Sequence, residues 1–283
     1  MVRGPSRVLV TGATGTLGRV VVRRALALGY DVVGVSRRGG LVAGQVEAEP
    51  LDVRDRRAVE TVLTAIQPEL VVHTAYAQDD WATTADGAAH VALGARAAGA
   101  RLVHVSSDVV FSGARVTYAE QAVPDPVSPY GAAKAAAETA VAAIDPTAVI
   151  ARTSLILGSP DSPMERLVRS LLGGAVTGEL FTDDIRCPVH VADLAAALLE
   201  LVRADASGVR HVAGPDAVSR FEIGELIAAR EGLSPAVLRP GSRRERGVPG
   251  PLDVRLDCSW TRGQLQTVLR GARAFLSDPG AMD

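Results

Sequence analysis

The sequence has few cysteines and no excess of charge of either sign. Its 283 residues include only Cys187 and Cys258, with no Cys-x-x-Cys pair, which excludes a disulfide framework and predicts two reduced thiols. None of the five histidines has the spacing of a metal ligand, so we expect no metal site. The 30 basic and 32 acidic residues give a net charge of -2, which excludes the basic surface that nucleic acids or anionic membranes require. We therefore expect a small-molecule substrate, with a homodimer left open.

Long hydrophobic runs are also missing. The apolar stretch Val8 to Val10 is too short for a signal peptide or a membrane span, so we expect a cytoplasmic protein. The composition, with 47% hydrophobic and 22% charged residues, is that of an ordinary globular chain with a large core.

Short β-branched runs alternate with Ala-rich stretches of helical period up to about residue 150. This alternation predicts an α/β fold, in which helices cover both faces of a doubly wound parallel sheet of the Rossmann type. The expected strands are 7–11, 31–35, 70–74, 102–106 and 148–152, and the expected helices are 17–28, 56–66, 86–98 and 129–144.

The second half of the chain has a looser rhythm. We expect residues 1–152 to form the dinucleotide-binding domain, to which some later segments return, and residues 153–283 to form mainly a smaller α/β substrate lobe. Helices are predicted there at 192–203, 222–230 and about 262–276, and irregular structure at 239–251.

A glycine-rich turn joins the first strand to the first helix. Gly12 allows a tight turn, Gly15 lets the backbone approach a pyrophosphate, and Gly18 allows close packing of helix on strand. The free N–H groups at the helix N-terminus then hold the anion. A merely structural turn is the alternative, and the position between strand and helix argues against it. The predicted contacts here are Gly12, Thr14, Gly15, Thr16, Leu17 and Gly18.

The end of the second strand predicts the cofactor. NAD-binding domains place a carboxylate there, whereas this chain has Ser36, Arg37 and Arg38, and arginine can pair bidentately with a 2′-phosphate. The turn thus indicates NADP(H), unless both arginines are simply solvated loop charges. By position alone, we expect cofactor contacts from Asp52 with Val53 and from Ala75 with Tyr76.

Tyr130 and Lys134 lie four residues apart on a helix that Ser128 caps, so they project from one face. A nearby ammonium would lower the pKa of the phenol from about 10. Tyr130 could then exchange a proton with a carbonyl oxygen, while Lys134 holds the nicotinamide ribose. We expect the third catalytic residue to be Ser107, at the carboxyl end of a strand, although a strand-end turn residue is the alternative.

These motifs together resemble the extended short-chain dehydrogenase family, and within it the dTDP-4-dehydrorhamnose reductases. The stretches that carry the resemblance are SSDVVFSG from Ser106, SPYGAAK from Ser128, DIRCPVHVADLA from Asp184 and LDCS from Leu256. The resemblance covers nearly the whole chain. It implies substrate contacts from Asp108, Val109, Thr153, Ser154 and Arg186.

Three positions depart from the family pattern. Val109 stands where the reductases usually have Tyr, Thr84 where many short-chain dehydrogenases have Asn, and Leu155 where the reductases have Trp. These changes indicate a family member whose substrate has diverged.

The resemblance implies an NADPH-dependent reductase of a ketone, namely the 4-keto group of a nucleotide-activated deoxysugar. Arg186 and Arg239 are candidates to meet its diphosphate, although both could be ordinary surface arginines. One alternative is an epimerase or dehydratase of the same superfamily, against which Val109 argues because dehydratases have Glu there. The other is a non-catalytic NADP-binding regulatory protein, because a regulatory subunit of methionine adenosyltransferase resembles the same reductases.

Overall fold

The structure is a computed structural model that describes residues 6–43 and 46–277. Its centre is an eight-stranded sheet in the order β13-β8-β6-β5-β1-β2-β4-β3, in which only β3 runs antiparallel to its neighbour. The strands are β1 (Arg7–Thr11), β2 (Asp31–Ser36), β3 (Gly40–Ala43), β4 (Val46–Pro50), β5 (Leu70–His73), β6 (Arg101–Ser107), β8 (Val149–Thr153) and β13 (Gly208–Val212). The predicted doubly wound α/β fold is confirmed.

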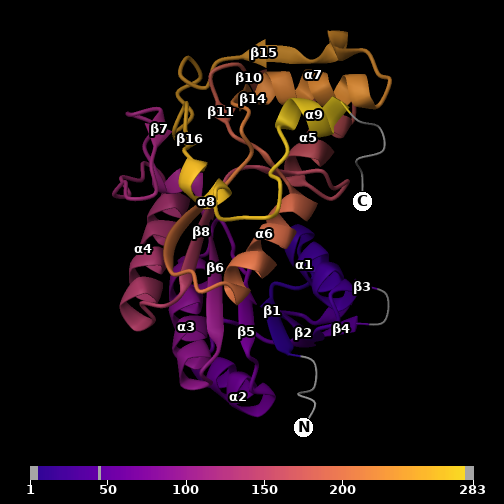
Figure 1. The fold of residues 1–283 in the computed structure, drawn as a ribbon. Helices are drawn as coiled ribbons and strands as arrows, with labels where there is room; N and C mark the ends of the chain where they lie inside the picture. The colour runs from indigo at the N-terminus through magenta and orange to yellow at the C-terminus, as the bar shows by residue number, and fades with distance from the viewer. Residues whose placement is uncertain (1–5, 44–45, 278–283) are drawn as a thin grey trace.

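Helices cover both faces of this sheet (Figure 1). One face is covered by α1 and α6, and the other by α2, α3 and α4, so each face has its own buried apolar layer. The helices are α1 (Thr16–Ala27), α2 (Arg56–Ile66), α3 (Gly87–Ala97), α4 (Pro129–Ile144) and α6 (Val191–Arg203). The start of α4 follows from its sequence: Ser128 Oγ accepts the Gly131 N–H at 3.1 Å, and Pro129 occupies the first turn.

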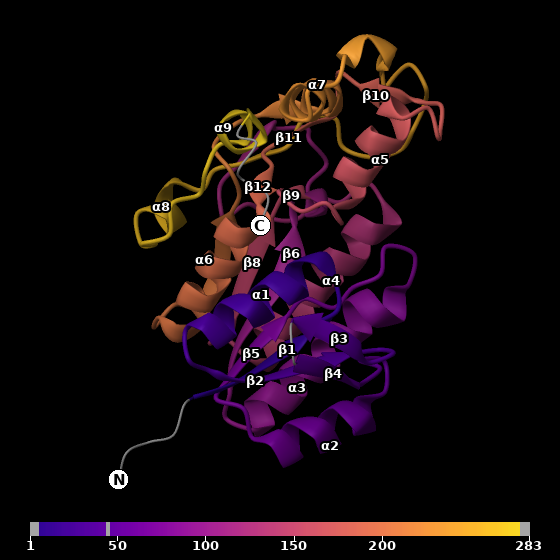
Figure 2. The same cartoon turned by 90° about the vertical axis from the view of Figure 1, so that its right-hand side faces the viewer.

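A second region lies beyond one end of the sheet (Figures 1 and 2). It has its own core, built largely from α5 (Pro163–Leu172), α7 (Arg220–Arg230) and α9 (Ala272–Ser277). Four short strand pairs lie outside the main sheet: β10 (Glu179–Phe181) with β15 (Arg239–Gly241), β11 (Ile185–Arg186) with β14 (Val218–Ser219), β12 (Val189–His190) with β9 (Ile156–Leu157), and β16 (Arg255–Leu256) with β7 (Thr117–Tyr118). Shorter turns are η1 (Ala82–Asp86), η2 (Asp108–Val110), η3 (Pro235–Val237) and α8 (Ser259–Arg262).

The chain returns to the main sheet after residue 153. Helix α6 packs in the same apolar layer as α1, and β13 pairs in parallel with β8. The second region is therefore interrupted in sequence, and the division of the chain near residue 152 remains a prediction.

The predicted helix at 262–276 is wrong. Only α8 and α9 form, and the segment between them is held away from helical geometry by carboxylates of α6. Glu200 accepts the N–H groups of Gln266 and Thr267, and Asp193 accepts the N–H of Arg270 at 3.0 Å. These acceptors come from a distant part of the chain, so the local pattern could not reveal them.

Candidate functional site

The glycine turn has the geometry that a phosphate-binding loop needs. Gly12 has φ +66°, and a Cβ there would lie 2.8 Å from the backbone N of Ala75. A Cβ on Gly18 would collide with the carbonyl oxygen of Gly12, so glycine is required for the first turn of α1 to pack this closely. Gly15 is the N-cap of α1, and no acidic side chain stands in the first turn, which leaves that end of the helix open to an anion.

A cavity of about 260 Å³ opens in front of this turn. It brings together nine of the predicted cofactor contacts: Gly12, Thr14, Gly15, Ser36, Arg37, Asp52, Val53, Ala75 and Tyr76. Its remaining lining residues are Val35, Leu51, Thr74, Ala77 and Thr83. Thr16 begins α1, and its hydroxyl donates to the carbonyl of Asp161 at 3.4 Å. The Leu17 side chain is buried in the core, so Leu17 could contact a ligand only through its backbone.

The far end of the cavity carries the charged groups. Arg37 and Arg38 are exposed at the end of β2, and of these two Arg37 lines the cavity. Asp52 is paired with Arg54 at 2.6 Å, and the hydrogen bond from Arg54 lowers the Asp52 pKa, with a smaller contribution from Arg37.

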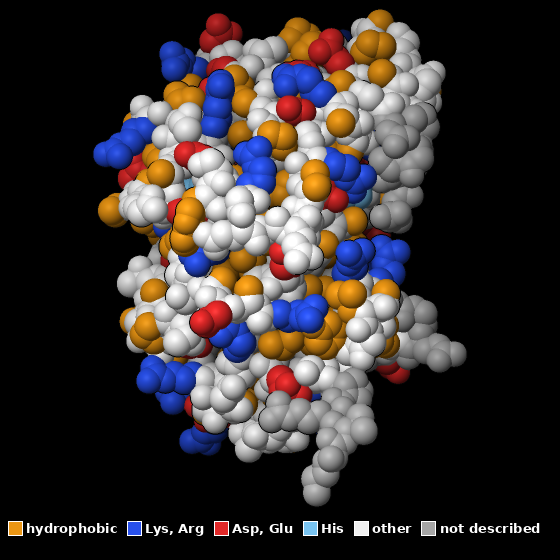
Figure 3. All heavy atoms as spheres, in the orientation of Figure 1, with side chains coloured by type: hydrophobic (Ala, Val, Ile, Leu, Met, Phe, Trp, Pro, Cys, Tyr) orange, Lys and Arg blue, Asp and Glu red, His pale blue; other side chains and the backbone are white. Residues whose placement is uncertain are grey.

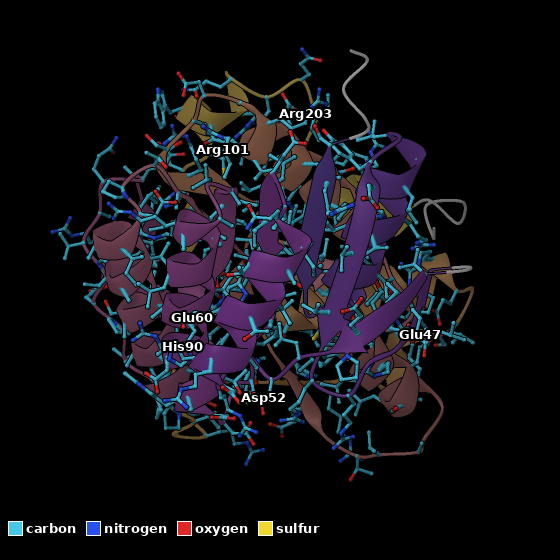
Figure 4. The ribbon with its side chains drawn as sticks, turned by 90° about the horizontal axis from the view of Figure 1, so that it is seen from below. Glu47, Asp52, Glu60, His90, Arg101 and Arg203 are labelled. Atoms are coloured by element: carbon cyan, nitrogen blue, oxygen red, sulfur yellow. The ribbon has the colours of Figure 1, made fainter. Side chains whose placement is uncertain are left out.

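His90 contacts the carbonyl oxygen of Val53 at 2.9 Å. Figure 4 places Asp52 and His90 on the same side of the molecule, opposite Arg101 and Arg203.

The loop after β5 forms one wall of the cavity and is held by Thr84. The Thr84 hydroxyl donates to the carbonyl of Ala77 at 2.6 Å and accepts the Ala77 N–H at 3.1 Å. Thr84 is buried in the π-helical turn η1. Its hydroxyl is thus used to shape the cavity wall.

Tyr130 and Lys134 both lie at the sheet-facing side of α4. Lys134 is 3% exposed, and its Nζ donates to the carbonyl of Val105 at 2.8 Å. The same ammonium lies 5.3 Å from the ring centroid of Tyr76, and the Tyr76 and Tyr130 rings are 5.9 Å apart. Tyr76 therefore connects the cofactor cavity to the Tyr130–Lys134 pair.

The expected direction of the Tyr130 pKa is corrected by the structure. Burial raises the pKa of the phenol above its ordinary value, and Tyr76 and Asp108 raise it further. Burial lowers the pKa of Lys134 to about 8, while Glu138 raises it. Desolvation of the phenol is the largest cause of this shift, and the four-residue spacing does not reveal it. At neutral pH Tyr130 is thus a protonated acid next to a charged lysine.

Ser107 lies at the carboxyl end of β6, as predicted, and caps the short helix η2. Its Oγ donates to Asp108 Oδ1 at 3.2 Å and accepts the Val109 N–H at 3.4 Å. Asp108 is buried, which raises its pKa, although Arg186 and Ser154 oppose that shift. Asp108 thereby acts as an acceptor for Ser107 and for Ser154, whose Oγ lies 2.6 Å from Asp108 Oδ2.

Four of the five predicted substrate contacts are engaged by the protein itself: Asp108 and Ser154 with each other, as described above, and Thr153 and Arg186 with other groups. Thr153 is buried and donates to the carbonyl of Val212 at 2.8 Å, which joins β8 to β13. Arg186 is 3% exposed, pairs with Asp184 and donates to the carbonyls of Leu252 and Pro251. Contact of these side chains with substrate therefore remains a prediction, and in this geometry their polar groups are engaged within the protein. Val109 and Leu155 remain partly exposed.

A buried ion pair behind α4 was not predicted from the sequence. Glu138, one turn beyond Lys134, accepts Arg152 Nη2 at 2.7 Å and Ser106 Oγ at 2.5 Å. Arg152 also donates to the carbonyls of Glu120 and Ala122. The signal was available, because Tyr130, Lys134 and Glu138 follow at intervals of four and so share one helix face.

The described residues hold no group of three or more His, Cys, Asp or Glu that could bind a metal ion. In the same part of the chain, no helix is both long and apolar enough to cross a bilayer. On the face drawn in Figure 3, basic and acidic side chains are interspersed.

Known proteins resemble this chain over almost its whole length. The chain is 29% identical over 273 residues to methionine adenosyltransferase 2 subunit beta of Xenopus laevis, covering 89% of this chain and 80% of that protein. It is 28% identical over 288 residues to dTDP-4-dehydrorhamnose reductase of Mycolicibacterium smegmatis, covering 96% and 84%. The crystal structure of dTDP-4-dehydrorhamnose reductase from Bacillus anthracis in complex with NADP superimposes with a TM-score of 0.84 at 25% identity, covering 96% and 97%.

The family model for the RmlD substrate binding domain matches residues 6–278. The chain therefore belongs to the RmlD substrate-binding domain family, within the extended short-chain dehydrogenases.

Proposed function

We propose that the protein is an NADPH-dependent reductase of a ketone, with the 4-keto group of a nucleotide-activated deoxysugar as substrate. The observation that carries this proposal is the position of Tyr130 and the buried Lys134, which both lie against Tyr76 in the wall of the dinucleotide cavity. The reductase relatives support the choice of substrate.

The glycine turn and the arginines at the end of β2 fit the phosphate groups of a dinucleotide. The backbone at Gly12 and Gly15 would hold the pyrophosphate at the start of α1, which Gly18 lets pack closely against the turn, and Arg37 and Arg38 would pair with a 2′-phosphate. NADPH, when bound, supplies the hydride for carbonyl reduction.

Tyr130 supplies the proton in this scheme. A phenol is protonated at neutral pH, so Tyr130 can donate a proton to the carbonyl oxygen as negative charge develops there. Lys134 stabilises the resulting phenolate and holds the nicotinamide ribose. Ser107 donates to the same oxygen after its hydroxyl turns away from Asp108.

A second candidate is a dinucleotide-binding protein without turnover. The likeness to methionine adenosyltransferase 2 subunit beta favours it, as does the Ser107 hydroxyl, which is engaged by Asp108. Tyr130 and Lys134 favour the reductase, because binding alone does not need a phenol and a buried ammonium on one helix face.

One assay separates the two candidates. The protein is mixed with NADPH and a dTDP-4-keto-6-deoxysugar, and cofactor oxidation is followed by absorbance, with Tyr130→Phe as the control. Turnover that Tyr130→Phe removes supports the reductase. If NADPH binds but no ketone in a sugar-nucleotide panel is reduced, the binding role replaces it.

A further inference from the structure

Lys134 is the only lysine in a chain that has 30 basic residues. An arginine side chain stays charged at every physiological pH, whereas the charge of a buried lysine depends on its surroundings. Burial lowers the pKa of Lys134 to about 8, close to neutral pH. The groups around its ammonium therefore determine whether the protein keeps this charge.

Few polar groups are available to this ammonium. Its Nζ can donate three hydrogen bonds, and the described part of the chain accepts one of them, at the carbonyl of Val105 and a distance of 2.8 Å. Glu138 is the nearby carboxylate, but its oxygens also accept Arg152 and Ser106. One neutral acceptor and a carboxylate that is already paired do not replace the hydration that the ammonium has lost.

The other titratable groups near the ammonium come from the elements packed around it. His73 of β5 and His104 of β6 are neutral at physiological pH, because burial lowers the pKa of both. Tyr130 on α4 is a protonated phenol, and Asp108 of η2 has Arg186 as a partner at 3.7 Å. These groups add no unpaired charge beside the ammonium.

The ring of Tyr76 supplies a further interaction. Nζ of Lys134 lies over this ring at 5.3 Å from its centroid, which is within the range of a cation–π interaction. Burial raises the pKa of the Tyr76 phenol, so the ring is uncharged at neutral pH and attracts the cation through its electron-rich face. Lys134 is 3% exposed, and such an attraction is stronger where water is excluded.

The protein holds the Tyr76 ring in this position. The Ala75 N–H donates to a threonine hydroxyl of β1 at 3.4 Å, and the N–H and the carbonyl of Ala77 both bond the Thr84 hydroxyl. The ring also packs against the ring of Tyr130, with centroids 5.9 Å apart. Because Tyr76 lines the dinucleotide cavity as well, the ring separates the ammonium from the solvent of that cavity.

We propose that Tyr76 is a positioning residue for Lys134, whose aromatic ring keeps the ammonium charged beside the dinucleotide cavity. The proposal rests on the function proposed above and deepens it, because that function requires a charged Lys134 to hold the ribose and to stabilise the Tyr130 phenolate. The ring alone carries the role, so phenylalanine should replace tyrosine, whereas an aliphatic side chain should not.

The single lysine allows a direct test. Protein labelled with carbon-13 in lysine gives one Cε signal in nuclear magnetic resonance, and its shift with pH reports the charge of Lys134 without any cofactor or substrate. Tyr76→Leu keeps an apolar cover and removes the aromatic face, while Tyr76→Phe keeps that face. The matched control is Trp81→Leu, which removes an exposed aromatic residue between β5 and η1.

The midpoint of the Lys134 titration should fall by about one pH unit in Tyr76→Leu, a tenfold change in the acid dissociation constant. Tyr76→Phe and Trp81→Leu should keep the midpoint of the unmodified protein. The pH above which NADPH affinity falls should shift downward in Tyr76→Leu by the same amount. In Lys134→Met, the further change Tyr76→Leu should leave the pH dependence of NADPH binding unaltered.

The proposal is overturned if the midpoint stays or rises in folded Tyr76→Leu, or if Tyr76→Phe lowers it as far as Tyr76→Leu does. Thermal unfolding shows which variants are folded, and Tyr76→Met replaces Tyr76→Leu if the latter does not fold. The expected shifts in a protein that reduces no ketone would support the role of Tyr76 and contradict the reductase. Ketone reduction with an unshifted midpoint in Tyr76→Leu would do the reverse.

Discussion

Replacing Glu138 by glutamine should destabilise the protein far more than the loss of an ordinary surface charge. The Glu138 and Arg152 side chains are 6% and 3% exposed, and Arg152 makes three hydrogen bonds to the carboxylate, at 2.7, 3.0 and 3.2 Å. Glutamine keeps the shape but leaves a buried guanidinium without a counter-charge. Removing one partner of a buried pair costs about 3 to 5 kcal/mol.

The assay is urea unfolding followed by circular dichroism, with Glu60→Gln as the matched control. Glu60 also pairs with an arginine at 2.7 Å, but both of those side chains are largely exposed, so its loss should cost less than about 0.5 kcal/mol. The double variant Glu138→Gln with Arg152→Met should be more stable than Glu138→Gln alone, because it removes the uncompensated charge. A loss below about 1 kcal/mol for Glu138→Gln would refute this reasoning.

Three further predictions concern the cofactor and the chemistry. Tyr130→Phe should lower kcat by about a hundredfold to ten-thousandfold while NADPH affinity, measured by titration, stays nearly unchanged, and a near-normal rate would show that another acid acts. NADPH should bind more tightly than NADH, and Arg37→Ala and Arg38→Ala should narrow the difference between the two dissociation constants; a preference for NADH would contradict the assignment. Because the Lys134 pKa is lowered from 10.5 to about 8, its ammonium is lost as pH rises through 8, so NADPH affinity should fall there. That fall should be absent in Lys134→Met, and an equal fall in both proteins would exclude Lys134 as its cause.

The same shift of Lys134 affects folding in the opposite sense. Between pH 8 and 10.5 the unfolded chain holds a proton on Lys134 that the folded chain has released, so this group adds stability as pH rises through that window. Burial of the ammonium is therefore a stability cost at neutral pH. The Val105 carbonyl and the Glu138 charge only partly offset it.

The sequence predicted the elements of the site whose geometry is local. The three glycines, the Ser128 cap and the spacing of Tyr130 and Lys134 each depend on residues within one or two turns, and the structure reproduces their arrangement. The confirmed fold follows from the same kind of local pattern.

Prediction from the sequence failed where a contact joins residues that are far apart in the chain. Nothing near Arg186 in the chain shows that Asp184 and the 251–252 backbone take its donors, and nothing near residue 267 shows that Glu200 accepts its N–H. The Tyr130 pKa depended on burial, which spacing does not reveal. Local patterns thus identified candidate side chains. Residues far away in the chain determine which of those side chains have polar groups available for a ligand.

Two buried histidines, His73 and His104, affect how Lys134 stays charged between the sheet and α4. His73 and His104 stack with ring centroids 5.2 Å apart, on the sheet face that α4 covers, and burial lowers the pKa of both, to about 3 for His73. Both imidazoles are therefore neutral at physiological pH and add no positive charge near Lys134. A second cation there would repel the ammonium and lower its pKa further. Glu138 supplies the nearby negative charge, while Arg152 balances Glu138 itself. The layer can thus keep one ammonium protonated at neutral pH beside Tyr130, which is the charge that the proposed acid requires.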